Sequence, residues 1–191
     1  QRDQTYRDLV SRAIDLSRGR GELFVGAGDV SFARTRDRIT FLNTLKVDGI
    51  VLLTPSFLSF RPTELIDYFH SLADVARMPV FLYDLPGLTG TDLGVDLIAQ
   101  MLRHPNIGGI KCSIPGAEKP QLLRCQVHED KRIIVAQPCL IDMYARHGFR
   151  EHLDGIFSVC PRTAVRIGAA IAKDDWDGAS RSQQQVADLL H

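Results

Sequence analysis

The stretch Ile107-Gly-Gly-Ile-Lys-Cys-Ser113 is a short apolar strand that carries one lysine, Lys111. An unpaired ammonium ion in apolar surroundings is unfavourable, so desolvation favours the neutral amine, which can attack a carbonyl and form a Schiff base. On its own, the strand is more typical of a lysine that reaches water at a strand end or pairs with a carboxylate. A second feature is needed to decide between these interpretations.

A second apolar strand, Val80-Phe-Leu-Tyr-Asp-Leu-Pro86, comes earlier in the chain and is followed by Gly87. If the two strands are parallel neighbours, Tyr83 and Lys111 lie near the carboxyl ends, on the same rim of the sheet. A phenol beside an amine can move the protons that formation of a carbinolamine requires, provided that the groups are within hydrogen-bond reach. Taken alone, a tyrosine at a strand end is more often a packed amphipathic ring.

Together the two motifs resemble a known family. The segments Tyr83-Asp-Leu-Pro-Gly-Leu-Thr-Gly90 and Gly108-Gly-Ile-Lys-Cys-Ser113, the latter preceded by His104-Pro-Asn-Ile, are similar to the lysine-dependent aldolase family of dihydrodipicolinate synthase and N-acetylneuraminate lyase. The resemblance implies a (β/α)8 barrel in which Lys111 forms the Schiff base with pyruvate or another 2-oxo acid, while Tyr83 transfers protons. No cofactor is expected.

Three further groups are expected near the substrate, namely Thr54, Ser113 and, from the resemblance, the backbone carbonyl of Phe157. Ser113 is two residues beyond the lysine and on the same strand face. A hydroxyl that bonds to the backbone at a strand end is an equally good account of Ser113.

Hydrophobic periodicity predicts alternating strands and helices along the chain, which is typical of a parallel sheet with helical crossovers. The expected strands are Glu22–Ala27, Gly49–Leu53, the Tyr83 strand, the Lys111 strand, Arg132–Ala136 and Leu153–Val159. The expected helices are Tyr6–Ser17, Phe32–Thr44, Thr63–Ala76, Val95–Arg103, Gln121–Val127, Leu140–Arg146, Thr163–Ala172 and Trp176–Leu190.

These six β/α units fit an open doubly wound sheet as well as they fit part of a barrel. The resemblance favours a barrel whose first two strands are absent, as though the sequence were a fragment. We expect a single partial barrel domain over residues 1–191, with residues 162–191 as its C-terminal helical part.

Composition gives no global electrostatic argument for nucleic acid or for an anionic membrane surface, because Lys and Arg total 23 and so do Asp and Glu. The one basic cluster, Arg34-Thr-Arg-Asp-Arg38, is expected to be a solvated helix face rather than a binding patch. The four cysteines and six histidines lack metal-ligand spacing, so no metal is expected. No run is long enough to span a membrane, and the cytoplasm is the expected location.

Departures from the family pattern affect the groups that choose the aldehyde. Leu88 stands where dihydrodipicolinate synthases carry an arginine, Asp84 replaces an asparagine, and Phe57 replaces a tyrosine that relays protons across a subunit interface. Gln137-Pro-Cys139 replaces a polar segment that contacts a polyol tail. Leu-Thr-Gly after the Pro-Gly turn is closer to the neuraminate lyase and sugar-acid aldolase branches.

The leading hypothesis is therefore a class I lyase of the pyruvate-aldolase type that acts on a sugar-acid or other neutral-headed aldehyde. The resemblance also implies a homotetramer built as a dimer of dimers. The alternative is a non-catalytic member of the family that serves as a binding or scaffold protein.

Overall fold

The computed structural model describes residues 3–17, 19–56, 58–113 and 118–190. Five parallel strands form one sheet: β1 (Phe24–Gly26), β2 (Gly49–Leu53), β3 (Val80–Asp84), β4 (Ile107–Cys112) and β5 (Arg132–Val135). Each strand pairs with the next one along the chain. This sequential order is the order of a (β/α) barrel, whereas the strand order of a doubly wound sheet reverses at a switch point.

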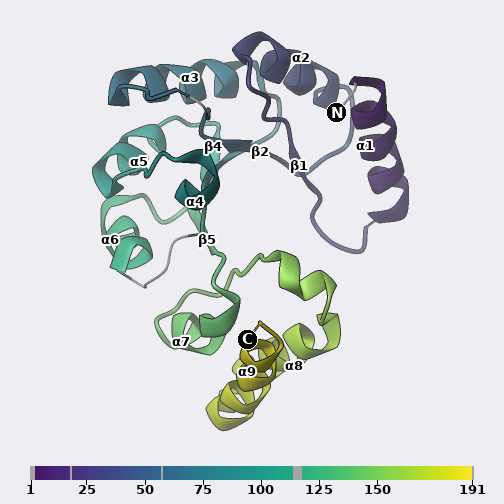
Figure 1. Ribbon diagram of the computed structural model, residues 1–191, viewed down its shortest axis with the longest axis vertical. Helices are drawn as coiled ribbons and strands as arrows, with labels where there is room; N and C mark the ends of the chain where they lie inside the picture. Colours follow the sequence, from purple (N-terminus) through teal and green to yellow (C-terminus); the bar gives the residue numbers. More distant parts are fainter. Residues whose placement is uncertain (1–2, 18, 57, 114–117, 191) are drawn as a thin grey trace.

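The helices are α1 (Asp3–Ser17), α2 (Phe32–Leu42), α3 (Pro62–Val75), α4 (Pro86–Thr89), α5 (Val95–Met101), α6 (Glu118–Gln126), α7 (Ile141–Arg146), α8 (Pro161–Ile171) and α9 (Trp176–Leu190), with 3-10 turns η1 (Pro138–Leu140) and η2 (Gly155–Ser158). In Figure 1, α1, α2, α3, α5 and α6 form an arc outside the strands, and α7, α8 and α9 form a group beyond β5. Their apolar stripes, such as Leu65, Phe69 and Leu72 on α3, account for this packing.

One predicted strand is wrong. Over residues 153–159 the expected strand is replaced by a single parallel bridge between Val135 and His152, after which the chain turns into η2. The side chain of Asp154 caps this turn by accepting a hydrogen bond from the backbone N–H of Ile156 at 3.0 Å. An aspartate followed by Gly155 favours a local cap over pairing in a strand ladder. The strand was predicted because the rest of the segment is apolar.

Alternation along the strands divides the sheet into two faces. On one face, Ile50, Leu52, Leu82 and Ile110 pack under the helices in the main hydrophobic core. The other face carries two in-register rows. We call the row nearer the amino ends of the strands the lower row; it consists of Gly26, Val51, Phe81, Gly109 and Arg132. The upper row, nearer the carboxyl ends, consists of Leu53, Tyr83, Lys111 and Ile134.

Arg132 closes the lower end of this second face. Its guanidinium lies 5.3 Å from the ring centroid of Phe24 and 5.5 Å from that of Phe81, two rings that pack edge to face. It also donates to Glu151 at 2.8 Å and to Glu22 at 2.9 Å, and these bonds raise the pKa of Arg132. Because Glu22 precedes β1 and Arg132 begins β5, one side chain ties the two ends of the sheet together.

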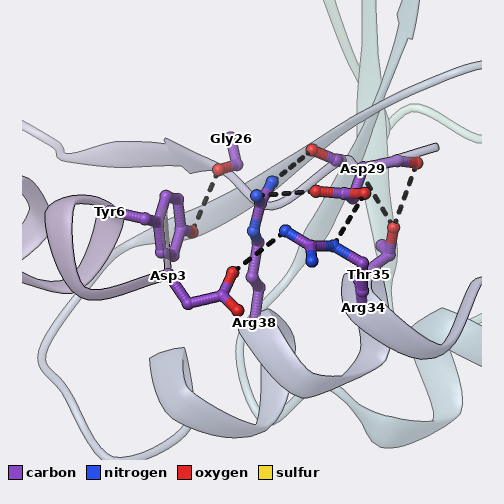
Figure 2. A network of polar contacts seen from close by, with 8 residues as sticks. Asp3, Tyr6, Gly26, Asp29, Arg34, Thr35 and Arg38 are labelled. Carbon is purple, nitrogen blue, oxygen red and sulfur yellow. Dashed lines mark hydrogen bonds and ion pairs between the residues drawn. The ribbon is translucent and has the colours of Figure 1, made fainter. Parts of the chain in front are cut away.

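The basic cluster on α2 is only partly the solvated face that its spacing suggests. Arg34 and Arg36 are exposed, but the side chain of Arg38 is 12% exposed and lies 4.7 Å from the ring centroid of Tyr6. Arg38 donates to the carbonyl of Gly28 at 2.6 Å and pairs with Asp29 at 2.7 Å (Figure 2). The expectation is therefore wrong for Arg38, which holds the loop after β1.

The hydrogen bonds of Arg132 to Glu22 and Glu151 should contribute to the free energy of unfolding. We expect Arg132→Met to lower the free energy of unfolding by about 1–2 kcal/mol, because the variant loses charge-assisted hydrogen bonds that are only partly shielded from water. Urea denaturation followed by circular dichroism measures the loss. The control is Arg61→Met, since the Arg61–Glu64 ion pair at 2.8 Å is largely exposed. Equal stability of the two variants would show that the Arg132 network contributes nothing.

Candidate active site

Lys111 and Tyr83 lie directly opposite each other on neighbouring strands. The register pairs Tyr83 of β3 with Lys111 of β4, and the Nζ atom of Lys111 lies 3.7 Å from the centroid of the Tyr83 ring. Lys111 is 8% exposed, and Leu53 and Ile134 flank the pair in the same row. Within the described ranges, no carboxylate forms an ion pair with Lys111. The structure thus brings the two predicted residues together, in surroundings that do not offer the amine a counter-charge.

Ser113 connects these two side chains. The Nζ atom of Lys111 donates to Ser113 Oγ at 3.0 Å, and Ser113 Oγ donates to the Tyr83 hydroxyl at 3.4 Å. The backbone N–H of Ser113 donates to the carbonyl of Asp84 at 3.0 Å, which fixes Ser113 to the strand that carries Tyr83. Both interpretations of Ser113 therefore describe part of the geometry: its backbone is held by the neighbouring strand, and its hydroxyl points at the lysine.

Asp84 projects from the opposite face of β3 into the helical layer, where it is fully buried. Lys119, at the start of α6, donates to Asp84 Oδ2 at 2.5 Å and to Asp92 Oδ1 at 2.6 Å. The backbone N–H of Leu93 donates to Asp84 Oδ1 at 3.4 Å. Burial raises the pKa of Asp84, although the hydrogen bond and charge of Lys119 oppose this effect. The buried Asp84 carboxylate is therefore paired with a cation, Lys119.

Cys112 lies next to this pair on the same face of β4. Its side chain is buried, and burial raises the pKa of the thiol to about 12, with the charge of Asp84 contributing in the same direction. A thiol with such a pKa is protonated at neutral pH and is a poor nucleophile. Cys112 is therefore a packed core residue, and Lys111 projects from the other face of the strand.

A pocket of about 520 Å³ opens beside the upper row, lined by residues 28–30, 53–56 and 88–90. Leu53 belongs to both the pocket wall and the row that contains Tyr83. Thr54 is 3% exposed, and within the described part of the chain its hydroxyl has no hydrogen-bond partner. Leu88, 71% exposed, forms the rim. The pocket therefore combines an apolar rim with a threonine whose buried hydroxyl lacks a hydrogen-bond partner among the described residues.

Asp29 is the charged residue of this pocket wall. Burial acts to raise its pKa, but the hydrogen bond from Arg34 and the charges of Arg38 and Arg34 outweigh burial and hold the pKa below its usual value. The Asp29 carboxylate is thus ionised and already paired (Figure 2). Among the described residues that line the pocket, none is a lysine or an arginine.

Phe157 is a predicted site residue through its backbone carbonyl, and its side chain belongs to a separate hydrophobic cluster. It lies in η2 and packs in the C-terminal cluster around Ile141, Ile167 and Ile171. Gln137 caps η1 and Cys139 lies within it, and the Gln137 carbonyl accepts from the backbone N–H of Leu140. Phe57 lies outside the described residues.

Two contacts near the site were not predicted from the sequence. A carboxylate in an apolar strand, Val80-Phe-Leu-Tyr-Asp84, signalled that a partner was required, but the partner Lys119 is 35 residues away in the chain. Arg38 has the helical spacing of a surface residue, and only the fold reveals the ring of Tyr6 against it. In the ranges that the structure describes, no group of three or more His, Cys, Asp or Glu residues could hold a metal ion, and no helix is long and apolar enough to cross a membrane.

The sequence pattern of the Dihydrodipicolinate synthetase family matches residues 2–191. The chain belongs to this family. A curated relative in the family, 4-hydroxy-tetrahydrodipicolinate synthase of Xanthomonas campestris pv. campestris, is 36% identical over 187 residues, which cover 92% of this chain and 60% of the relative. Another curated relative, from Stenotrophomonas maltophilia, is matched over 61% of its own length. The chain thus spans about three fifths of the length of these family members.

Solved structures share the fold of this chain. YagE, a prophage protein of E. coli K12 solved in complex with pyruvate, superposes with a TM-score of 0.91 at 23% identity, over 97% of this chain and 64% of that one. A variant of the 2-keto-3-deoxygluconate aldolase of Sulfolobus solfataricus superposes with a TM-score of 0.80 at 18% identity, over 86% of this chain and 55% of that one. Together with the family match, they confirm the barrel-type fold.

The Asp84–Lys119 pair should be visible in the pH dependence of stability. We expect Lys119→Met to lower the free energy of unfolding by about 3 kcal/mol at pH 8, because it leaves a buried carboxylate unpaired. The pKa of Asp84 in the folded state is raised, so the protonated acid is the form that folding favours, and stability falls as pH rises through that pKa. Removing Lys119 strengthens this trend, so the loss should shrink between pH 8 and pH 4.

The double variant Asp84→Asn/Lys119→Met should recover most of the lost stability and show little of this pH dependence. Lys46→Met, at an exposed position, is the matched control. Chemical denaturation at several pH values measures all four proteins. If Lys119→Met were as stable as Lys46→Met at pH 8, the pair would have no energetic role.

Proposed function

We propose that this chain carries the Schiff-base centre of a class I lyase that acts on pyruvate or another 2-oxo acid. The observation that carries the proposal is the Lys111 amine, which is buried, lacks a carboxylate partner among the described residues, and lies against Tyr83 in register. A lysine held in this way is suited to act as a nucleophile rather than as half of an ion pair. Family membership and the fold are consistent with this chemistry.

In the proposed reaction, Lys111 Nζ attacks the ketone carbon of the 2-oxo acid, and loss of water from the carbinolamine leaves an imine. Tyr83 supplies the proton that leaves with the water and later exchanges protons with the substrate. Removal of a proton from the neighbouring carbon gives an enamine, which adds to an aldehyde in the synthetic direction and is formed by carbon–carbon cleavage in the reverse direction. Thr54, Ser113 and the carbonyl of Phe157 are proposed to contact the substrate.

The pocket beside Leu53 supports a neutral, hydroxyl-bearing aldehyde as the second substrate. Its described lining offers the buried hydroxyl of Thr54 and an Asp29 carboxylate that two arginines already neutralise, and it offers no cation for a second carboxylate. Leu88 at the rim cannot replace a bidentate arginine contact. We therefore place the specificity nearer to sugar-acid aldolases than to the synthases after which the curated relatives are named.

The assembly and location are further parts of the proposal. By resemblance we propose a homotetramer, and the exposed Leu58, in the segment that the family places at a subunit contact, suits such a surface. Four free thiols suit a reducing compartment such as the cytoplasm.

A non-catalytic scaffold is the competing function, and trapping of the imine separates the two. Wild-type protein incubated with pyruvate and borohydride should gain a carboxyethyl group on Lys111, found by peptide mass spectrometry. Lys111→Ala should fold and gain none, because removal of a buried amine relieves desolvation. The exposed Lys173→Ala should be labelled as fully as the wild type. A wild-type protein that is never labelled would support the scaffold.

A further prediction concerns the aldehyde. We expect higher kcat/KM with 2-oxo-3-deoxy sugar acids than with aspartate semialdehyde plus pyruvate. Leu88→Arg should raise kcat/KM for aspartate semialdehyde by about tenfold, as expected for one charge-assisted contact. Leu122→Arg, at an exposed position on α6, should leave kcat/KM for this aldehyde unchanged. Efficient turnover of aspartate semialdehyde with Leu88 in place would show that another residue governs selectivity.

A further inference from the structure

The amine of Lys111 and the hydroxyl of Tyr83 do not face each other. Lys111 Nζ lies over the face of the Tyr83 ring, 3.7 Å from its centroid. A phenol hydroxyl lies in the plane of its ring, so an amine stacked on the ring face is out of line for a direct hydrogen bond with it. The contact stabilises a cation over the ring, but it gives the proton no direct route between nitrogen and oxygen.

The Ser113 hydroxyl occupies that route. It accepts a hydrogen bond from Lys111 Nζ at 3.0 Å and donates one to the Tyr83 hydroxyl at 3.4 Å. A hydroxyl can donate and accept at the same time, which is the property that a proton carrier needs. Lys111, Ser113 and Tyr83 thus form a continuous hydrogen-bonded chain from the nucleophile to the acid.

We propose that Ser113 is a catalytic residue that carries the proton from Lys111 Nζ to Tyr83. The proposal rests on the proposed function and adds a step to it. When Nζ bonds to the ketone carbon, the nitrogen must lose a proton and the former ketone oxygen must gain protons before it leaves as water. Ser113 Oγ takes the proton from nitrogen and passes its own to Tyr83, and Tyr83 passes its own to the carbinolamine oxygen. This first transfer gives the neutral carbinolamine, and a second passage along the same chain moves the remaining proton of the nitrogen to that oxygen as the carbon–oxygen bond breaks. Water leaves, a neutral imine remains, and both side chains are back in their starting state.

The fold fixes Ser113 for this role through its backbone. Its N–H donates to the carbonyl of Asp84, the residue next to Tyr83, at 3.0 Å. The Asp84 side chain is itself held by Lys119. The distance from Ser113 to Tyr83 is thus set by the ladder between β3 and β4. By the family resemblance, a tyrosine that relays protons is expected at the position of Phe57, and phenylalanine has no hydroxyl. A hydroxyl from the same strand pair could take over that proton transfer.

The test is the rate of imine formation, measured by borohydride quenching at timed intervals after mixing with saturating pyruvate. We expect Ser113→Ala to slow labelling of Lys111 by about a hundredfold, the lower range for proton transfer by a positioned side chain, with an unchanged final extent. Ser113→Thr should restore the rate, and Ser113→Cys, a weaker donor of similar size, should give an intermediate one. Ser71→Ala, at an exposed position of α3, should match the wild type.

The outcomes separate the two proposals. If the wild type is never labelled, the Schiff-base function fails. If the wild type is labelled and Ser113→Ala is labelled equally fast, the function stands and the relay is overturned. A variant that needs only more pyruvate, with the same rate at saturation, would also overturn the relay in favour of substrate binding. Should Ser113→Ala lack a wild-type circular dichroism spectrum, Ser113→Cys decides by the same criteria.

Discussion

The register between β3 and β4 is the constraint on which the rest of the site depends. Parallel strands in register place residues of the same face opposite each other, and here this pairing puts the ring of Tyr83 against the amine of Lys111. The same ladder sends Asp84 and Cys112 to the opposite face, into the helical layer. A slip of one residue would exchange the two sets and bury the lysine among the helices. The ladder thus decides which side chains face Tyr83 and which ones enter the helical layer.

The interior cations of this chain are divided by whether they have a counter-charge. Arg132 has Glu22 and Glu151, Arg38 has Asp29, and Lys119 has Asp84 and Asp92. Lys111 has a hydroxyl and a ring within the described residues, and no carboxylate. Paired cations hold loops and strand ends in place, whereas the unpaired amine retains the lone pair that covalent chemistry requires once its proton has left. Lys119 lies in the helical layer, whereas Arg132 shares the face of the sheet that carries Lys111.

Sequence reasoning predicted much of this fold because local patterns determine it. The apolar runs around Tyr83 and Lys111 indicated buried strands, and the alternation of strands with helices indicated a parallel sheet. The prediction failed over residues 153–159, where Asp154 caps a turn with its own side chain and competes with the ladder. Contacts between residues distant in the chain were beyond reach: the sequence does not indicate that Lys119 meets Asp84, or that Arg38 lies on Tyr6. Phe157 was placed by analogy with a strand end, and the structure puts it in a helical cluster instead.

The pair formed by Asp84 and Lys119 has a consequence for the order in which mutations can accumulate. Lys119 has a second partner, Asp92, whose side chain is 70% exposed, so a lysine at position 119 would keep an ion-pair partner if position 84 carried an uncharged asparagine. An aspartate that arrived first would be a buried carboxylate without a cation, at a cost of several kcal/mol. The lysine is therefore expected to precede the aspartate in the lineage. Once both residues are present, loss of Lys119 before Asp84 would leave the buried carboxylate unpaired and destabilise the fold. The pair is therefore hard to reverse one substitution at a time.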